Sequence, residues 1–182
     1  MALYQNSVPL APGKYRLSIA ARDVNGGNTA TYEAAIDVPP FPEDQLAASS
    51  LILADYMERV PARGIGMGQF VIGDTNVRPR FSETFNPTEK MGIYIQLYHL
   101  ANAAIEYQIT RNADNESVLT YTEDITAPRS QVTIQKWLPL KDFALGDYTL
   151  RMRVTDKTTN QTITPSATFT IAPSPTSASA LR

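Results

Sequence analysis

The sequence of 182 residues contains no cysteine and only one histidine. The absence of cysteine excludes disulfide bonds, thiolate metal sites and cysteine nucleophiles. The histidine, His99, follows an apolar alternating stretch, where it is more often structural or solvated than catalytic. Carboxylates are scattered mostly as single residues, so no pair is marked as the acid and nucleophile of a glycosidase. We therefore expect a protein that is not an enzyme and has no catalytic residue.

Clusters of charge and long apolar runs are also missing. Sixteen basic and 18 acidic residues give a net charge of −2, and the basic residues form no patch that would indicate nucleic-acid binding. No apolar run approaches the roughly 20 residues of a transmembrane helix. Residues 23–28 lack the spacing of a calcium loop, and residues 64–68 lack a phosphate-binding fingerprint. The sequence therefore predicts no metal and no cofactor.

What the sequence does contain is a regular alternation of apolar and polar residues. Between residues 146 and 156 every second position is apolar, namely Tyr148, Leu150, Met152 and Val154. A period of two predicts a β-strand with one buried face. A polar turn follows, and Ala167, Phe169 and Ile171 then predict a second strand. The two segments together predict an antiparallel hairpin.

The same pattern occurs a second time near the N-terminus. Tyr15 precedes Tyr148 by 133 positions (148 − 15), and this offset continues without a gap through the turn into the second strand. A match of this length indicates a tandem of similar domains. In both copies the Gly-x-Tyr-x-Leu pattern is typical of the tyrosine corner, in which a buried tyrosine bonds to the preceding backbone. Tyr15 and Tyr148 are the predicted corner residues.

Short alternating segments spaced by about ten residues, with polar turns between them, predict an all-β fold. We expect an Ig-like (fibronectin III-like) antiparallel β-sandwich, preceded by the terminal hairpin of a similar, incomplete domain. The expected divisions are a hairpin at residues 1–39, a proline-rich linker at 40–48, a complete sandwich at 49–172 and a disordered tail at 173–182.

A few side chains suggest a binding site. Tyr94, Tyr98 and Tyr121 lie on predicted strands and could form an aromatic platform for stacking a sugar, although a partly buried sheet face packed on the other layer is the simpler explanation. Arg78 and Arg80 could bind a carboxylate or phosphate, or form ion pairs at a solvated strand edge. The only tryptophan, at position 137, lies between two apolar runs and is expected in the core.

Several stretches resemble the C-terminal region of the GWxTD-domain proteins, which are uncharacterised exported proteins common in Acidobacteria. The resemblance spans most of residues 10–156 and rests on LAPGKYRLSIAARDVNGGN, LAASSLILADYMERVP, GQFVIGDTNVRPRFSETF, EKMGIYIQLYHL and LPLKDFALGDYTLRMRVTDK. The Gly-Trp-x-Thr-Asp motif that names the family is absent from this sequence. The resemblance implies Ig-like modules near the end of a larger exported protein, in the periplasm or outside the cell.

Two functions follow from these expectations. The first is a structural or protein-interaction module whose partners are other protein domains or a second copy, contacted by strand addition through the N-terminal hairpin. The second is a carbohydrate-binding module that uses the surface tyrosines. Neither function requires nucleic acid or a membrane span.

Overall fold

The chain divides into two units, Met1–Glu43 and Asp44–Arg182, in a computed structural model that describes residues 5–6, 8–126 and 130–173. The division falls inside the expected linker at residues 40–48. Leu46 is buried in the core of the second unit, and the residues after it form strand β3 (Ala47–Ala48). The end of that expected linker therefore belongs to the sandwich. The expected tail lies, apart from Pro173, outside the described residues.

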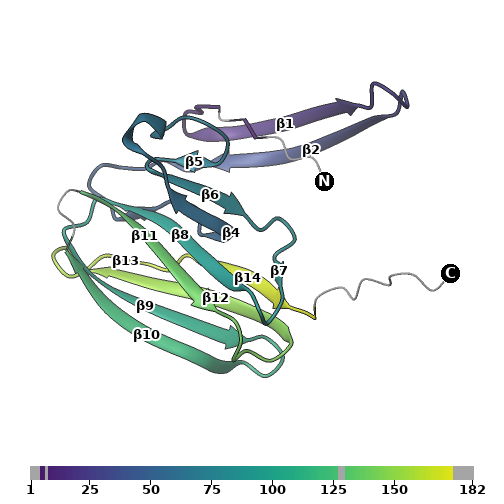
Figure 1. Ribbon diagram of the computed structural model, residues 1–182. Helices are drawn as coiled ribbons and strands as arrows, with labels where there is room; N and C mark the ends of the chain where they lie inside the picture. Colours follow the sequence, from purple (N-terminus) through teal and green to yellow (C-terminus); the bar gives the residue numbers. More distant parts are fainter. Residues whose placement is uncertain (1–4, 7, 127–129, 174–182) are drawn as a thin grey trace. The chain divides into compact units, whose positions relative to one another are not determined.

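The described residues of the first unit form a hairpin, in which β1 (Gly13–Arg22) pairs antiparallel with β2 (Thr29–Val38) over their full lengths (Figure 1). The turn between them is closed by two backbone bonds, because the amides of Asp23 and Gly27 donate to the carbonyls of Asn28 and Asp23. Gly27 has a φ of 72°, which glycine adopts without steric cost. The loop at residues 23–28 is thus a hairpin turn.

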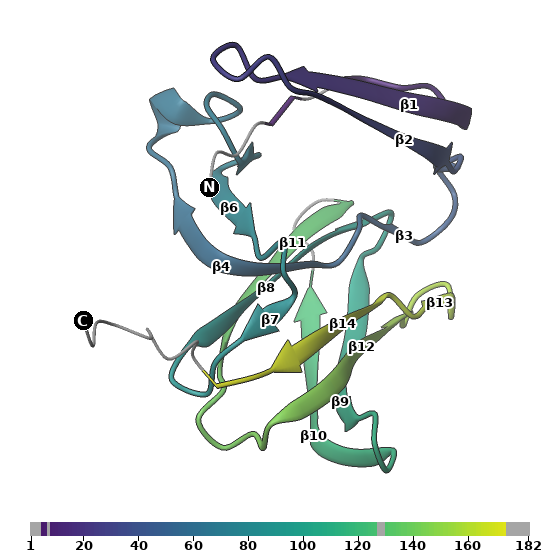
Figure 2. The ribbon, with the colours of Figure 1, turned by 90° about the vertical axis from the view of Figure 1, so that its right-hand side faces the viewer.

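The second unit is a β-sandwich of two sheets, seen from the side in Figure 2. The first sheet has the order β10-β9-β12-β14-β7, with β13 also paired to β12. Its strands are β7 (Thr84–Phe85), β9 (Asn102–Arg111), β10 (Glu116–Thr126), β12 (Gly146–Asp156), β13 (Thr162–Ile163) and β14 (Ser166–Ile171). All pairs in this sheet are antiparallel except β14 with β7.

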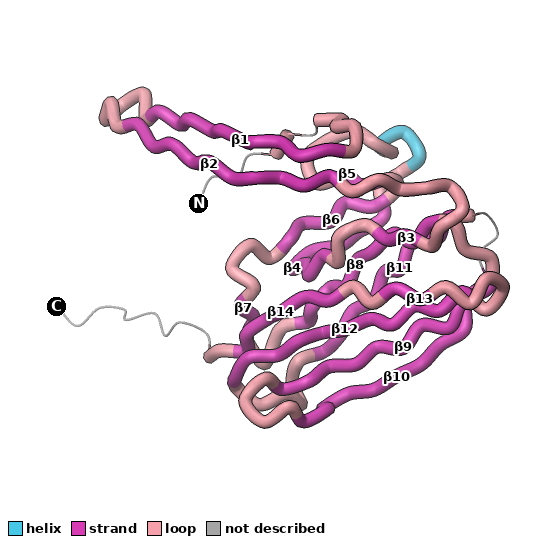
Figure 3. The backbone as a smooth tube through the Cα atoms, turned by 180° about the vertical axis from the view of Figure 1, so that it is seen from behind, coloured by secondary structure: helices cyan, strands magenta, loops and turns pink. Residues whose placement is uncertain are grey.

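The second sheet has the order β11-β8-β4-β6-β5, with β3 also paired to β8, and all its pairs are antiparallel. Its remaining strands are β4 (Ile52–Arg59), β5 (Val71–Ile72), β6 (Thr75–Pro79), β8 (Lys90–Tyr98) and β11 (Gln131–Pro139). A short 3-10 helix, Ala62–Gly64, lies between β4 and β5. Strands account for nearly all the regular structure (Figure 3), so the predicted all-β sandwich is confirmed.

The core lies between the two sheets and is made by alternate residues of the central strands. In β8 the inward residues are Met91, Ile93, Ile95 and Leu97, each at most 4 % exposed. From the opposite sheet β9 and β12 contribute their own alternate rows to the same cluster. The period-two pattern therefore identified the inward faces of these strands correctly. Trp137 is different, because it is 44 % exposed on edge strand β11, and its expected place in the core is wrong.

The outer face of the second sheet carries a smaller apolar cluster of Ala54, Val77 and Tyr94. Strand β4 pairs with β8 only from Ile52 to Ala54, and its pairing with β6 shifts register between Ala54 and Tyr56. After this bulge the β5–β6 hairpin covers Tyr94, whose hydroxyl donates to the carbonyl of Ile72 at 3.3 Å. A β-bulge bends its strand, which accounts for the change in direction.

Gly92 allows β4 to approach β8 this closely. A Cβ at position 92 would lie 2.8 Å from Cε of Met57 and 3.2 Å from both Cβ and O of Ala54. The methionine end can move, but the alanine atoms belong to or adjoin the paired backbone. We expect Gly92→Ala to lower the free energy of unfolding by about 1–2 kcal/mol, as overpacked cores do, measured by denaturant titration.

Two variants control this prediction. Gly64→Ala, whose new Cβ would meet Val60 at an ordinary 3.5 Å, should change stability by less than about 0.5 kcal/mol. Adding Met57→Ala to Gly92→Ala should not restore stability, because the contact with Ala54 remains. A Gly92→Ala protein as stable as the wild type would contradict the close approach.

Candidate interaction site

Hairpin β1–β2 carries an exposed apolar face. Alternate residues of the two paired strands share this face, and Leu17, Ile19 and Tyr32 are 37 %, 49 % and 60 % exposed. The opposite face is polar and includes a hydrogen bond from Ser18 to Glu33. A lone two-stranded hairpin is at best marginally stable in water. The exposed apolar row on this hairpin is therefore a candidate interaction surface.

The equivalent face in the second unit is buried except at Ala167, which is partly exposed. The residues of β12 that correspond to the β1 row are Tyr148, Leu150, Met152 and Val154, all 0 % exposed. On β14, Phe169 and Ile171 are at most 2 % exposed, and the rings of Tyr148 and Phe169 stack at 5.4 Å. The same sequence pattern thus faces a core in one unit and is exposed in the other.

The first strands of the two hairpins also begin in the same way. The hydroxyl of Tyr15 donates to the carbonyl of Ala11 at 2.8 Å, and that of Tyr148 donates to the carbonyl of Ala144 at 2.9 Å. Two residues before each tyrosine is a glycine with an unusual positive φ, 154° at Gly13 and 144° at Gly146. Both tyrosines therefore make the hydrogen bond of a tyrosine corner, which spans four residues, but only the ring of Tyr148 is buried and that of Tyr15 is partly exposed.

The free edge of β1 completes the site. Among the strands of the described residues, β1 pairs with β2 alone, whereas β12 lies between β14 and β9 and pairs with β9 from Tyr148 to Asp156. An unpaired edge presents a row of backbone donors and acceptors to an incoming strand. Hairpin β1–β2 therefore offers both a backbone edge and an adjoining apolar face.

The three tyrosines proposed for ligand stacking are not brought together. Tyr94 is 1 % exposed beneath the β5–β6 hairpin, and Tyr98 lies half-buried on the same strand, β8. Tyr121 lies on β10 in the other sheet and is 53 % exposed. The period of two placed Tyr94 and Tyr98 on one face correctly, but it could not show that an inserted hairpin covers that face. These three side chains form no common platform.

Tyr121 instead belongs to a pocket of about 160 Å³ between edge strands β10 and β11, which sequence reasoning missed. Lys136 lies over the rings of Tyr107 and Tyr121, with Nζ 5.5 and 5.6 Å from their centroids, and pairs with Glu123 at 2.8 Å. Burial and the neighbouring Glu123, which accepts the hydroxyl's hydrogen bond, raise the pKa of Tyr107 above its ordinary value. Trp137 also lines this pocket.

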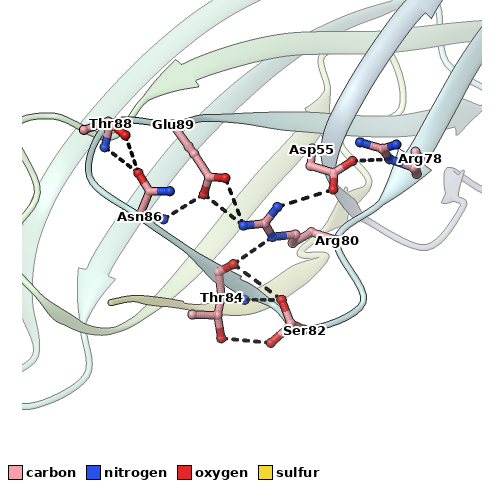
Figure 4. Close-up of polar contacts among 8 residues, drawn as sticks. All are labelled: Asp55, Arg78, Arg80, Ser82, Thr84, Asn86, Thr88 and Glu89. Atoms are coloured by element: carbon pink, nitrogen blue, oxygen red, sulfur yellow. Dashed lines mark hydrogen bonds and ion pairs between the residues drawn. The ribbon is translucent and has the colours of Figure 1, made fainter. Parts of the chain in front are cut away.

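Arg78 and Arg80 have partners within the chain (Figure 4). Arg80 donates through Nε to the carbonyl of Thr84 at 2.8 Å and through Nη2 to both oxygens of Glu89 at 2.9 and 3.0 Å. Asp55, the bulge residue of β4, lies 2.6 Å from Arg78 and 3.4 Å from Arg80. Two cations and two anions balance one another, so the local ion pairs are the correct interpretation of these arginines.

No group of three or more His, Cys, Asp or Glu side chains is arranged to hold a metal ion among the described residues. His99 has a φ of 58° in the turn after β8, and its amide donates to the carbonyl of Ser130. Within residues 5–6, 8–126 and 130–173 there is no helix long and apolar enough to cross a membrane.

Comparison with known proteins gives similarity in fold only. No protein-family model and no curated protein sequence matches the chain. A family 123 glycoside hydrolase from Clostridium perfringens, described in work on glycolipid glycan hydrolysis, is similar at 9 % identity with a TM-score of 0.41, over 71 % of this chain and 28 % of that one. The chain thus spans less than a third of that enzyme.

The C-terminal domain of Wzt is similar at 12 % identity, also with a TM-score of 0.41, over 74 % of this chain and 81 % of that domain. Similarity at this level concerns the β-rich architecture and carries neither an activity nor a ligand to this chain.

The arginine cluster yields a test of its structural role. Arg80 is 25 % exposed on its side chain and joins β4, β7 and the start of β8, so Arg80→Ala leaves two carboxylates without this cation. We expect a loss of about 2–3 kcal/mol in the free energy of unfolding. Arg78→Ala, at a site 48 % exposed, should cost less than about 1 kcal/mol. Equal effects in denaturant titrations would contradict the different roles of the two residues.

Proposed function

We propose that this chain is a non-enzymatic β-sandwich module of an exported bacterial protein, and that it docks another protein domain through hairpin β1–β2. One observation carries the proposal. The apolar row of β1 is exposed at Leu17 and Ile19, whereas the corresponding row of β12 is 0 % exposed. Apolar surface of this kind gains about 25 cal/mol for each Å² removed from water. The resemblance to the C-terminal region of GWxTD-domain proteins supports the exported setting.

The hairpin supports docking by strand addition for a second reason. Its polar face, which includes Arg16, Ser18 and Glu33, is suited to solvent, so only the opposite face needs a cover. The open edge of β1 adds main-chain hydrogen bonds, which supply affinity in strand addition, while the apolar side chains supply specificity. The arginine cluster of the second unit is internally balanced and offers no comparable surface.

A photo-crosslinking residue placed at either of two adjacent positions tests the docking function. In the full chain, produced in the organism from which the gene derives, a crosslinker replacing Ile19 should give one dominant protein adduct. The same group replacing Ser18, on the opposite face, should give little or none, because successive side chains of a strand point to opposite faces. Equal labelling at both positions, or none at Ile19, would contradict docking through the apolar face.

Carbohydrate binding is the second candidate function. The pocket between β10 and β11 is a better candidate site for it than the platform of Tyr94, Tyr98 and Tyr121 that the sequence suggested. Tyr121 and Trp137 are exposed aromatic rings at that pocket, and the Lys136–Glu123 pair offers polar groups beside them. Its volume of about 160 Å³ is below the roughly 300–1,000 Å³ of common ligand sites, so it could hold only a single ring. This size places the sugar function second.

The pocket contains the only tryptophan of the chain, which makes its fluorescence a specific reporter. If a sugar ring enters, titration with neutral oligosaccharides should shift the emission of Trp137, and Tyr121→Ser should weaken the saturable change at least several-fold. Tyr32→Ser is the matched aromatic control. Tyr32 belongs to the first unit and does not line the pocket, so this substitution should leave the response unchanged. An emission that stays constant across the oligosaccharide panel would remove this candidate.

A further inference from the structure

The outer face of the first sheet carries two exposed arginines on strand β12. The inward row of this strand contains Leu150, Met152 and Val154, so Arg151 and Arg153 point outward. Residues two positions apart on a strand are separated by roughly 6.4–6.8 Å. Among the described residues, neither arginine side chain makes a hydrogen bond or an ion pair. Two like charges this close repel each other, and an anion between them would relieve the repulsion.

Other arginines of the second unit do have carboxylate partners. Arg78 and Arg80 share Asp55, and Arg111 pairs with Asp114 at 2.9 Å. These side chains are held within the chain and have little capacity left for a ligand. The arginine pair on β12 differs from them because its donors remain available.

Strand β9 places further polar groups beside this pair. In the antiparallel register Glu106 lies opposite Arg153, and Gln108 lies opposite Arg151. Both point outward, since Tyr107 between them is buried. In the part of the chain that the structure describes, neither the Glu106 nor the Gln108 side chain is hydrogen-bonded. Two cations and one anion thus share this face, with a net charge of +1.

A break in the neighbouring strand opens a pocket here. Strand β12 pairs with β14 as far as Arg151 and with β13 from Val154 onward, and Thr164 and Pro165 lie between the two paired segments. Strands β9, β12 and β13 lie side by side on this face (Figure 3). The pocket has a volume of about 300 Å³ and is lined by Glu106, Gln108, Arg151, Arg153, Thr162 and Thr164.

The lining selects the chemistry of a ligand. Guanidinium groups donate in a planar fork that matches a carboxylate. A singly charged carboxylate would neutralise the net charge of the pocket, whereas a doubly charged phosphate would leave it negative. Glu106 and Gln108 can then bond to hydroxyl groups of the same molecule. None of the six lining residues is aromatic, so a neutral sugar would find no ring on which to stack.

We propose that this pocket binds a uronic-acid residue of an acidic glycan, with its carboxylate between Arg151 and Arg153 and its hydroxyls at Glu106 and Gln108. The volume of about 300 Å³ is at the lower end of the roughly 300–1,000 Å³ of common ligand sites, which suits a short saccharide. The pocket shares no residue with hairpin β1–β2 or with the pocket between β10 and β11. This inference therefore goes beyond the proposed function and does not depend on it.

An acidic protein side chain fits the pocket less well than a uronic acid. It would bring a carboxylate to the arginines, but its stem carries no hydroxyl groups. Glu106 and Gln108 would then lose water without gaining a partner, which is costly for a charged or polar group. A sugar acid offers both kinds of group in one molecule.

Calorimetric titration of the full chain with uronate trisaccharides tests the site. The panel contains the trimers of galacturonate, glucuronate and mannuronate, each with the neutral trimer of the corresponding hexose. At least one uronate should bind saturably and its neutral counterpart should not. Arg151→Gln and Arg153→Gln should each weaken this binding about tenfold or more, because each removes a charged hydrogen-bond donor. Arg153→Lys should also weaken it, since lysine keeps the charge but loses the fork.

Two variants serve as controls for the arginine substitutions. Arg63→Gln removes one cation from the 3-10 helix of the same unit, and Tyr121→Ser alters the pocket between β10 and β11. Both should bind the uronate as the wild type does. The Arg151→Gln and Arg153→Gln proteins should keep the wild-type denaturant midpoint, because neither side chain has a partner among the described residues. Unchanged affinity in both of them, or an equal loss in Arg63→Gln, would overturn the site.

Two further probes separate the proposed ligand from other anions. Inorganic phosphate that binds more tightly than every uronate would overturn the carboxylate assignment. A tri-aspartate peptide that binds as tightly as the best uronate would show an acidic protein segment instead of a glycan. A panel without any saturable uronate binding would also overturn the proposal. None of these results changes the crosslink expected at Ile19, and failure of that crosslink leaves the titration as predicted here.

Discussion

Burial of one face of β12 is the constraint on which the second unit depends. This strand pairs with β9 on one side and β14 on the other, so its backbone is satisfied laterally and only its side chains remain to be covered. Tyr148, Leu150, Met152 and Val154 are 0 % exposed and require an apolar sheet opposite, which β8 supplies. The hydroxyl of Tyr148 keeps its hydrogen bond by reaching Ala144, so a large polar ring can enter the core without an unpaired donor.

Features that depend on local sequence could be predicted from it. Alternation identified the inward rows of β8, β9 and β12. The repeated Gly-x-Tyr pattern located both corner hydrogen bonds, because each joins residues four positions apart. Which segment covers a given face of a sheet does not depend on the local sequence of that strand. Tyr94 is covered by the β5–β6 hairpin, an insertion whose direction follows from the bulge after Ala54, and nothing in the period of two indicates that cover.

The candidate sites show the same limit. The sequence placed Arg78 and Arg80 together, but their partners Asp55 and Glu89 lie up to 25 residues away and meet them only in the folded chain, where β4 has its register shift at Asp55. Trp137 is adjacent to an apolar residue, Leu138, but it alternates with Ile134 and Leu138, which pack on the core, and pairs with Gly92 on the outer face of the sheet. Apolar neighbours in the sequence therefore predicted burial at a position that the period of two assigns to the outer face.

The exposed hairpin follows from the rule that organises the sandwich. In β12 an apolar row is stabilising because a third strand and a facing sheet remove it from water, whereas in β1 the same row has one paired strand beside it. A two-stranded ribbon buries too little surface to offset the conformational entropy of ordering about twenty residues. In the proposed docking, burial of Leu17 and Ile19 would add the missing stability, so order in this hairpin and binding of the proposed partner are expected to be coupled.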